Sequence, residues 1–290
     1  MTDANLVWIP GQTAVLGSDR HYPEEAPARS VTVDGFSIQD RQVTNAAFTE
    51  FVSATGYLTV AERPLNPADY PGAPAVNLQP GSMVFRRTSG PVDLRHLSLW
   101  WTWTPGASWR HPLGPTSSID KRAAHPVVHV AYEDAEAYAA WAGLALPTEA
   151  EWEVAARGGL DRADYTWGEH PEFPGQRLAN YWHGEFPWRP EPGYGRTTEA
   201  GAFPPNDYGL FDMAGNVWEW TTDWYGGTEA ASYDPAQPQF TVPRKVVKGG
   251  SFLCADSYCM RYRPAARRPQ MIDTGMSHIG FRCVKRSDSS

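Results

Sequence analysis

The chain has 290 residues, and its 33 acidic and 25 basic side chains give a formal net charge of −8. This acidic balance, with basic residues scattered except near 261–268, argues against a nucleic-acid or anionic-membrane surface as the main role. A chain of this length buries a substantial core, and no repeat, low-complexity segment or linker divides it, so we predict one domain over residues 1–290.

The amino-terminal residues 1–6 have neither a basic start nor a long apolar stretch, and no later segment has the apolar run that spans a bilayer. The chain has only three cysteines, which fits a reducing compartment. We therefore expect a cytoplasmic monomer that contacts no membrane and no nucleic acid.

The first forty residues predict short strands, because apolar runs alternate with Pro, Gly and Asp turn signals. These strands are expected at 6–9, 14–17, 31–33 and 36–38. A helix then begins at Thr44 or Asn45, either of which can cap it, and ends at Gly56. Residues 61–125 contain nine prolines and little periodicity, so the prediction there is a long irregular segment.

Two more helices are predicted after this segment, one from Ala131 to Gly143 and one that begins after Thr148 and ends at Gly158. Thr148 and Glu151 have the spacing of a capping box, in which each side chain accepts a hydrogen bond from the backbone of the other. Further strands are expected at 214–220, 246–248 and 279–284. Thirteen Trp, 26 Gly and 26 Pro indicate many turns and short strands fixed by large aromatic side chains, with modest helix content.

Two cysteines near the carboxyl end, Cys254 and Cys259, are the first candidates for chemistry. Four residues separate them, so a turn at 255–257 is needed to bring the sulfur atoms together. Soft thiolates select Cu(I), zinc or iron-sulfur clusters. Two thiols without a further soft ligand do not complete the four tetrahedral ligands of zinc, whereas two thiolates are enough for Cu(I). A small-loop disulfide and two unrelated buried thiols are the alternatives.

Several runs of residues point to a known family. They are Glu25 to Arg29, Thr55 to Thr59, Trp109 to Pro112, Leu146 to Glu153, Gly184 to Pro187, Gly215 to Trp220, Gly249 to Cys254, Ser257 to Cys259, Arg261 to Arg263 and Gly280 to Cys283. In this order, and over nearly the whole length, they resemble the formylglycine-generating enzymes, also called sulfatase-modifying factors. The resemblance implies a compact, irregular α+β fold related to C-type lectins, with little regular secondary structure.

The same resemblance implies an activity, the oxidation by O2 of a cysteine in a Cys-x-Pro-x-Arg peptide to Cα-formylglycine, which activates sulfatases. The partners would be an unfolded or nascent sulfatase chain and an external reductant. Cys254 and Cys259 would hold Cu(I) and leave room for a third thiolate, that of the substrate. The pocket for substrate and oxygen would be lined by Cys254, Cys259, Ser251, Trp218 and Tyr258.

Two other residues are expected to contact the peptide, Arg267 and His278. Arg267 is equally able to pair with a carboxylate of the fold. His278 stands where many members of the family have Asn. Ala255 and Asp256 replace a His-Arg pair that many members carry between the paired cysteines, which could alter substrate preference. Cys283 has no evident disulfide partner and is interpreted as a buried structural thiol.

Calcium is the second cofactor that the resemblance implies. The expected ligands are Asp212, Gly215, Val217 and Glu219. Carboxylates that flank backbone carbonyls in a turn suit a hard cation, although an ordinary capped turn would use the same residues. A second calcium site would use Asn180, Tyr181 and Tyr194, but Pro192 stands near the position of its Asp, which weakens this prediction.

Three alternative functions remain open at this point. An iron-dependent sulfoxide synthase would need a histidine pair, and His125 and His129, which come closest, flank a segment that reads as a strand. A non-catalytic, lectin-like binding module would have no need for two close thiols. A thiol redox protein would use Cys254 and Cys259 as a disulfide couple, but their spacing differs from that of thioredoxin-like motifs.

Overall fold

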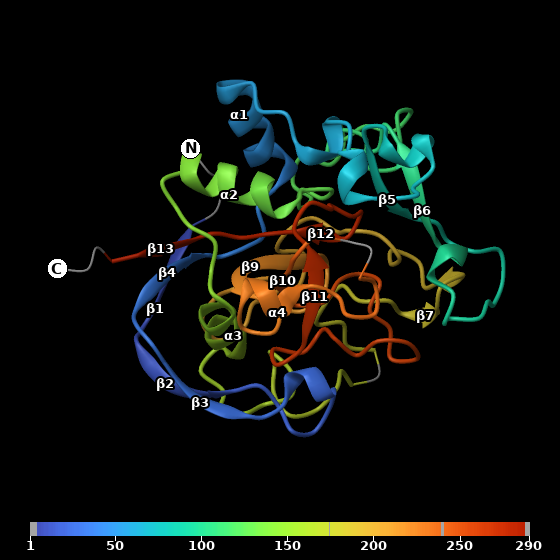
Figure 1. The fold of residues 1–290 in the computed structure, drawn as a ribbon. Helices are drawn as coiled ribbons and strands as arrows, with labels where there is room; N and C mark the ends of the chain where they lie inside the picture. Colours follow the sequence, from blue (N-terminus) through green and yellow to red (C-terminus); the bar gives the residue numbers. More distant parts are fainter. Residues whose placement is uncertain (1–4, 174, 239–240, 288–290) are drawn as a thin grey trace.

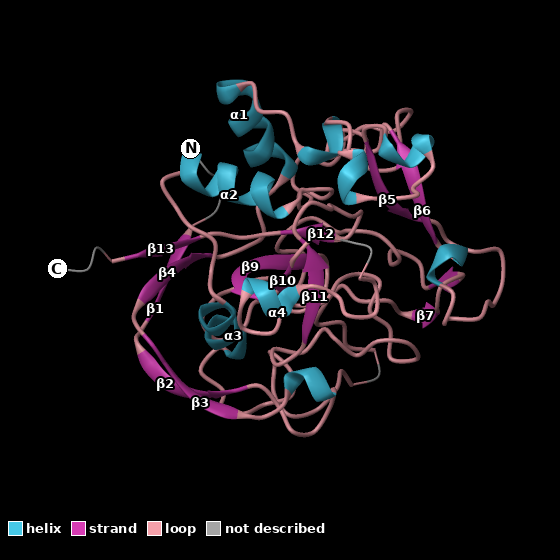
Figure 2. Cartoon of the chain, viewed as in Figure 1, coloured by secondary structure: helices cyan, strands magenta, loops and turns pink. Residues whose placement is uncertain are grey.

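Figure 1 shows the computed structural model of the chain, which describes residues 5–173, 175–238 and 241–287. Residues 1–4, on which the interpretation of the amino terminus partly depended, lie outside the described residues, as do the last three residues of the predicted domain. None of the helices in these ranges is long and apolar enough to cross a membrane. Loops and turns occupy much of the fold between short strands and helices (Figure 2).

The two ends of the chain share one antiparallel sheet. Its strand order is β1 (Leu6–Ile9), β4 (Phe36–Gln39) and β13 (Val284–Arg286). Strand β1 pairs Leu6 with Gln39, and β13 pairs Val284 with Ile38 on the other side of β4. The ribbon of β2 (Gln12–Leu16) and β3 (Arg29–Val33) continues from it at the lower left of Figure 1. All four predicted amino-terminal strands are confirmed, with β2 and β3 each beginning two residues earlier.

The central sheet has the order β11, β10, β9, β12. Its strands are β11 (Arg267–Met271), β10 (Arg244–Lys248), β9 (Trp218–Trp224) and β12 (Ile279–Gly280). Strand β10 is antiparallel to both of its neighbours, whereas β12 runs parallel to β9. The sequence predicts β10 but misses β11, and the expected last strand is divided, since β12 and β13 belong to different sheets.

The helices begin and end where the capping signals predict. Helix α1 (Asn45–Thr55) starts at Thr44, whose hydroxyl accepts the Ala47 amide at 3.2 Å, and ends at the left-handed Gly56. Helix α3 (Glu149–Arg157) has the complete capping box, because Thr148 accepts the Glu151 amide and Glu151 accepts the Thr148 amide. The remaining helices are α2 (Tyr132–Trp141) and the single-turn α4 (Glu229–Ser232).

The segment at 61–125 is more ordered than expected. Strands β5 (Gly81–Phe85) and β6 (Trp101–Pro105) form a two-stranded antiparallel sheet in it, at the upper right of Figure 1. Short 3-10 helices occupy Val60–Glu62, Pro67–Asp69, Ala75–Leu78 and Leu97–Leu99. Eight of the nine prolines lie outside the two strands and the ninth, Pro105, ends β6, so the local composition hid a pairing between strands. A second small ribbon joins β7 (Gly184–Glu185) to β8 (Arg189–Pro190).

The largest core cluster lies between α1, α2 and the central sheet. It contains stacked and edge-on aromatic rings, such as Phe48, Tyr138 and Phe281. Cys254, Cys259 and Trp218 belong to the same cluster of buried residues. Residues 249–263, which we call the cysteine loop, follow β10. Strands β9 and β10 therefore place this loop against the core and not on an exposed tip.

Candidate active site

The cysteine loop is bent in two places. Gly249 and Gly250, directly after β10, have φ of 90° and 73°, and a Cβ at Gly250 would lie 2.7 Å from the Arg261 carbonyl oxygen. Only glycine fits there without strain. Farther on, the amides of Tyr258 and Cys259 both donate to the Ala255 carbonyl, at 2.9 and 2.6 Å. The predicted turn between the cysteines is thus present.

This turn brings the sulfur atoms of Cys254 and Cys259 to 3.3 Å from each other. Both are free thiols, so the pair is neither a disulfide nor two unrelated buried side chains. They are 2% and 5% exposed, which places two soft donors side by side in an apolar environment. Two adjacent, unbonded sulfur donors suit a soft monovalent ion. Among the described residues no cluster of three or more His, Cys, Asp or Glu side chains is placed to hold a metal ion.

The two thiols have different acidities. Burial raises the pKa of Cys254 well above its ordinary value. The hydrogen bond from Cys254 lowers the pKa of Cys259 to about 6. At neutral pH the two sulfurs therefore share one proton, and the pair supplies one thiolate, the form that a metal or disulfide reaction requires.

Aromatic rings form the wall next to the thiols. The ring of Tyr258 stacks on Phe186 with centroids 4.8 Å apart and meets Trp100 edge-on at 5.9 Å. Trp218, at the start of β9, is 2% exposed. Ser251 is fully buried, and its hydroxyl accepts the Leu253 amide at 3.2 Å. The structure thus brings Trp218 into the thiol cluster and places Ser251 and Tyr258 on the same loop.

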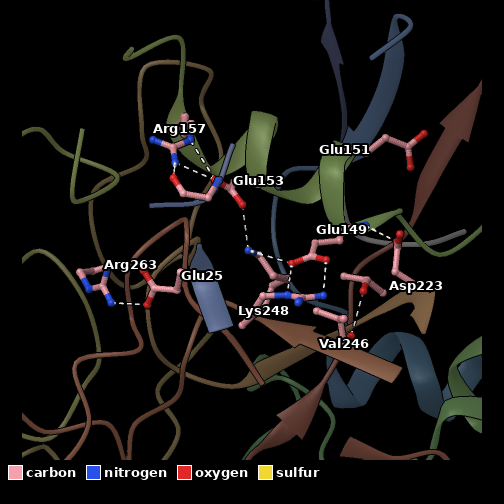
Figure 3. Close-up of polar contacts among 12 residues, drawn as sticks. Glu25, Glu149, Glu151, Glu153, Arg157, Asp223, Val246, Lys248 and Arg263 are labelled. Carbon is pink, nitrogen blue, oxygen red and sulfur yellow. Dashed lines mark hydrogen bonds and ion pairs between the residues drawn. The ribbon is translucent and has the colours of Figure 1, made fainter. Parts of the chain in front are cut away.

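An amino-terminal segment braces this loop, and no sequence signal pointed to it beyond the run that begins at Glu25. The Tyr22 hydroxyl accepts the Met260 amide at 3.1 Å. The Glu24 carboxylate accepts a hydrogen bond from Nε of Arg261 at 2.9 Å, and the Arg261 guanidinium lies over the Tyr22 ring. Glu25 holds Arg263 through both carboxylate oxygens, in a pair that is almost completely buried (Figure 3).

Arg267, one of the two predicted peptide contacts, is bound elsewhere. Its guanidinium makes a bidentate pair with Glu149, at 2.7 and 2.8 Å. Glu149 and Glu153 of α3 also lie 3.6 and 3.0 Å from the buried Lys248 ammonium, as Figure 3 shows. Arg267 thus links β11 to α3. Its contact with the peptide stays a prediction.

The second predicted contact, His278, is buried and neutral. Burial lowers its pKa well below the ordinary value. Its ring lies 4.8 Å from that of Trp101, and its Nδ1 atom has no hydrogen-bond partner in the described part of the chain. A peptide group could accept or donate at this nitrogen, so His278 stays a prediction.

Arg268 is a residue that the sequence did not single out. Neighbours on a strand point to opposite faces of the sheet. Arg267 faces α3, so Arg268 faces the thiol cluster, where its partner across the sheet, Val247, also packs. Strand alternation would have identified it, had β11 been recognised.

Ala255 and Asp256, which replace the His-Arg pair that many family members carry between the cysteines, each have a local role in this structure. Ala255 is 1% exposed and packs with Leu253 and Phe252. Asp256 accepts the Tyr262 hydroxyl at 2.5 Å. At these two positions this chain thus has a methyl group that points into the core and a carboxylate that forms an internal hydrogen bond.

The residues predicted for calcium come together only in part. Asp212 is buried, with one carboxylate oxygen on the Gly201 amide and the other, Oδ1, without a partner in the described part of the chain. Burial raises its pKa to about 6. The Glu219 carboxylate is fully used by Arg282, Trp152 and Gln42. The Gln42 amide nitrogen also lies 3.2 Å from the Val217 carbonyl. Gly215 lies in the same turn, next to Asn180.

The second set of predicted calcium ligands is less complete. Asn180 has a buried amide oxygen without a partner in the described residues. The Tyr181 hydroxyl instead donates to Glu172, and the Tyr181 ring stacks on Tyr262. Tyr194 is half-buried beside His183. Pro192 is exposed and has no ligating side chain.

The remaining candidates have structural partners. His129 is held by the Ser82 hydroxyl and the Pro112 carbonyl, and burial lowers its pKa to about 4. His125 pairs with the Thr197 hydroxyl at 3.0 Å. Cys283 is a fully buried free thiol whose pKa burial raises.

The whole chain can now be compared with known proteins. Residues 1–287 match the model of the sulfatase-modifying factor enzyme 1-like domain. The chain belongs to this family. The resemblance that the sequence motifs carried is thereby confirmed.

Curated relatives cover nearly the full length of the chain. A formylglycine-generating enzyme of Mycobacterium tuberculosis is 54% identical over 96% of this chain and 97% of its own. One of Thermomonospora curvata is 45% identical over 96% and 92%. A mouse family member named an inactive Cα-formylglycine-generating enzyme 2 is 39% identical over 97% and 86%. Family membership thus includes inactive proteins, so activity has to be argued from the site.

A solved structure supports the fold class. PvdO from Pseudomonas aeruginosa superposes with a TM-score of 0.62 and covers 97% of this chain and 94% of its own. At 21% identity this likeness concerns the fold alone. Short mixed sheets with few helices confirm the predicted α+β class.

Proposed function

We propose that this protein is an oxidase that converts the cysteine of a Cys-x-Pro-x-Arg sulfatase motif to Cα-formylglycine with O2, and so activates sulfatases. One observation carries the proposal, the two free, buried sulfur atoms 3.3 Å apart in the loop after β10. The relatives named formylglycine-generating enzymes support the substrate class. A purely structural member of the family would have no need for an unbonded thiol pair in its core.

The cofactor that suits this pair is Cu(I), held by the sulfur atoms of Cys254 and Cys259. Thiolates are soft ligands, and Cu(I) accepts a low coordination number. When bound, copper would supply the electron transfer to O2 that the closed-shell organic groups of the protein cannot provide. Cys259 is already the more acidic thiol, so the loss of one proton, from Cys254, completes the ligand pair.

The surrounding residues orient the substrate and exclude water. The stack of Tyr258 on Phe186 and the buried Trp218 close an apolar wall beside the sulfurs. Ser251 holds the loop through the Leu253 amide, so its hydroxyl hydrogen is free to donate to substrate or oxygen. Because the sulfurs are buried, the client chain must be extended there, which favours a nascent or unfolded sulfatase in the cytoplasm.

The overall reaction balances with an external thiol as reductant. The thiol side chain of the peptide cysteine, one O2 and two reductant thiols give the aldehyde, hydrogen sulfide, one disulfide and one water. Oxygen receives four electrons, two from the substrate carbon and two from the reductant thiols. An external reductant is therefore a required partner.

The test is mass spectrometry of a synthetic Cys-x-Pro-x-Arg peptide incubated aerobically with the protein, Cu(I) and dithiothreitol. Conversion of the thiol to an aldehyde lowers the peptide mass by about 18 Da. A peptide with Ser in place of Cys is the control. Loss of about 18 Da from the Cys peptide, abolished by a Cu(I) chelator, is expected. An unchanged peptide, with copper bound to the protein, would favour a non-catalytic binding module.

We also propose calcium at the first of the two predicted sites. The buried, unpartnered Oδ1 of Asp212 is the donor that supports it, with the carbonyls of Gly215 and Val217 as further hard ligands. Gln42 has to give up its contact with the Val217 carbonyl for this, and Glu219 stays with Arg282. The ligands predicted for a second calcium ion form a weaker set; they are Asn180, Tyr181 and Tyr194.

Calcium binding should raise thermal stability. At one hundred times its Kd, calcium is expected to stabilise the fold by about 2.7 kcal/mol, measured by differential scanning fluorimetry. Asp212→Asn keeps the bond to the Gly201 amide and should lose this response. Because burial raises the pKa of Asp212 to about 6, the response should be larger at pH 8 than at pH 5. An equal response in the variant would place calcium elsewhere.

A further inference from the structure

The basic run at 261–268 contains four arginines, and three of them are neutralised. Arg261 pairs with Glu24, Arg263 with Glu25, and Arg267 with Glu149. Each pair ties the cysteine loop or β11 to a distant part of the chain. These three charges are therefore balanced before any ligand arrives.

Arg268 is the exception. It is partly buried on β11, the edge strand of the central sheet, and the described residues give it neither a carboxylate partner nor a hydrogen bond from its guanidinium. Long cationic side chains in such positions are ordinarily paired, because burial of an uncompensated charge costs free energy. A missing counter-charge at this place calls for an explanation.

The direction of Arg268 is fixed by the central sheet. In the ladder of β10 and β11, Lys248 lies opposite Arg267 and Val247 lies opposite Arg268. The first pair faces α3, where Lys248 forms ion pairs with Glu149 and Glu153, and Arg267 forms one with Glu149. The second pair therefore faces the other side, and Val247 packs there in the cluster that contains Cys254, Cys259 and Trp218.

Arg268 also lies near His278, a neighbour of this cluster. Burial lowers the pKa of His278, and the positive charge of Arg268 lowers it further. The His278 carbonyl in turn accepts a hydrogen bond from the amide of Trp218, which belongs to the core cluster with both thiols. In the described part of the chain, Arg268 is thus a cation without a counter-charge on the side of the central sheet that faces the thiol pair.

Two thiolates and one monovalent copper ion carry a net charge of −1, and a third thiolate from the substrate raises it to −2. A buried anion of this kind requires a nearby cation, because the apolar core does not solvate it. We propose that Arg268 is the fixed counter-charge of the copper-loaded thiol pair, and that it strengthens both Cu(I) binding and capture of the substrate thiolate. The inference depends on the proposed copper function, and it makes Arg268 a positioning residue that holds no metal itself.

The test is Cu(I) affinity, measured by competition with the chromogenic chelator bathocuproine disulfonate under anaerobic conditions. Arg268→Met removes the charge and keeps a long side chain, and it should weaken Cu(I) binding at least about tenfold, or ~1.4 kcal/mol. Arg268→Lys should recover most of the affinity. The matched control is Arg29→Met, which removes an exposed arginine of β3. Thermal unfolding of the copper-free Arg268→Met variant should show no loss of stability, because the removed charge has no partner in the described residues. A clear loss would show that Arg268 has a structural role.

The outcomes separate the two proposals. Wild-type protein that fails to bind Cu(I), or that binds it equally well without the two thiols, overturns the copper function itself. Wild-type protein that binds through both thiols, with an equal affinity in Arg268→Met, overturns the counter-charge alone. An Arg268→Lys variant as weak as Arg268→Met would also overturn it, because charge would then not be what matters. If Arg268→Met does not fold, Arg268→Gln replaces it in the same comparison.

Discussion

Replacement of Cys254 or Cys259 by Ser is expected to abolish formylglycine formation, with a loss of at least about 10³-fold, or ~4 kcal/mol of transition-state stabilisation. A hydroxyl is a hard and much less acidic donor, so one remaining thiol cannot hold Cu(I) in the buried pair. Both exchanges are small in volume, and a serine hydroxyl can keep the hydrogen bonds that each sulfur makes with its partner in the pair and with neighbouring residues of the loop. The fold should therefore survive, which circular dichroism can check.

The measurement is single-turnover mass spectrometry of the peptide aldehyde, with Cu(I) supplied. Cys283→Ala is the matched control, because Cys283 is equally buried but lies outside the pair. It should keep full activity per folded molecule. Substantial activity in either Ser variant would contradict a chemistry that needs both thiols.

Arg263→Met is expected to cause the largest loss of stability, about 3–5 kcal/mol, since it leaves the Glu25 carboxylate buried without its cation. The side chains of Arg263 and Glu25 are 1% and 0% exposed, so water cannot replace the lost partner. Arg263 also donates to the Met260 carbonyl at 2.9 Å, within the cysteine loop. A loss of this size is a large fraction of the total stability of a globular protein.

Chemical denaturation with urea would measure this change. The double variant Glu25→Gln with Arg263→Met should recover a substantial part of the loss, because no charge is then left unpaired. Equal destabilisation in the single and double variants would show that packing of the long side chains dominates, and that charge does not.

Local signals in the sequence predicted local structure well. The Thr148 and Glu151 capping box, the glycine end of α1 at Gly56 and the turn between the cysteines are all interactions over a few residues, and the structure has each of them. Caps and turns of this kind depend on residues that are close together in the sequence, so they can be recognised from the sequence alone. The thiol pair could be predicted for the same reason, because its two cysteines are close together in the sequence.

Interactions between distant segments were not predictable in this way. Strand β11 has no alternating apolar pattern, because Arg267 and Arg268 are both charged although they point to opposite faces, and only Arg267 has a carboxylate partner in the described residues. The pairing of β5 with β6 was hidden by the prolines around it. Side-chain choices at Arg267 and Gln42 depend on carboxylates more than one hundred residues away. Without the sheet register, nothing in the sequence distinguishes Arg268 from its neighbour.

The brace between Tyr22, Glu24 and Glu25 and the cysteine loop has a consequence for biosynthesis. Its contacts join residues 237 and 238 positions apart, so the loop lacks its supports until almost the whole chain has left the ribosome. Contacts of such long range form late, because closing the chain over that distance costs conformational entropy before any contact offsets it. A partly synthesised chain would thus present no organised thiol pair to metals or oxidants, and reactivity would arise only with completion of the fold.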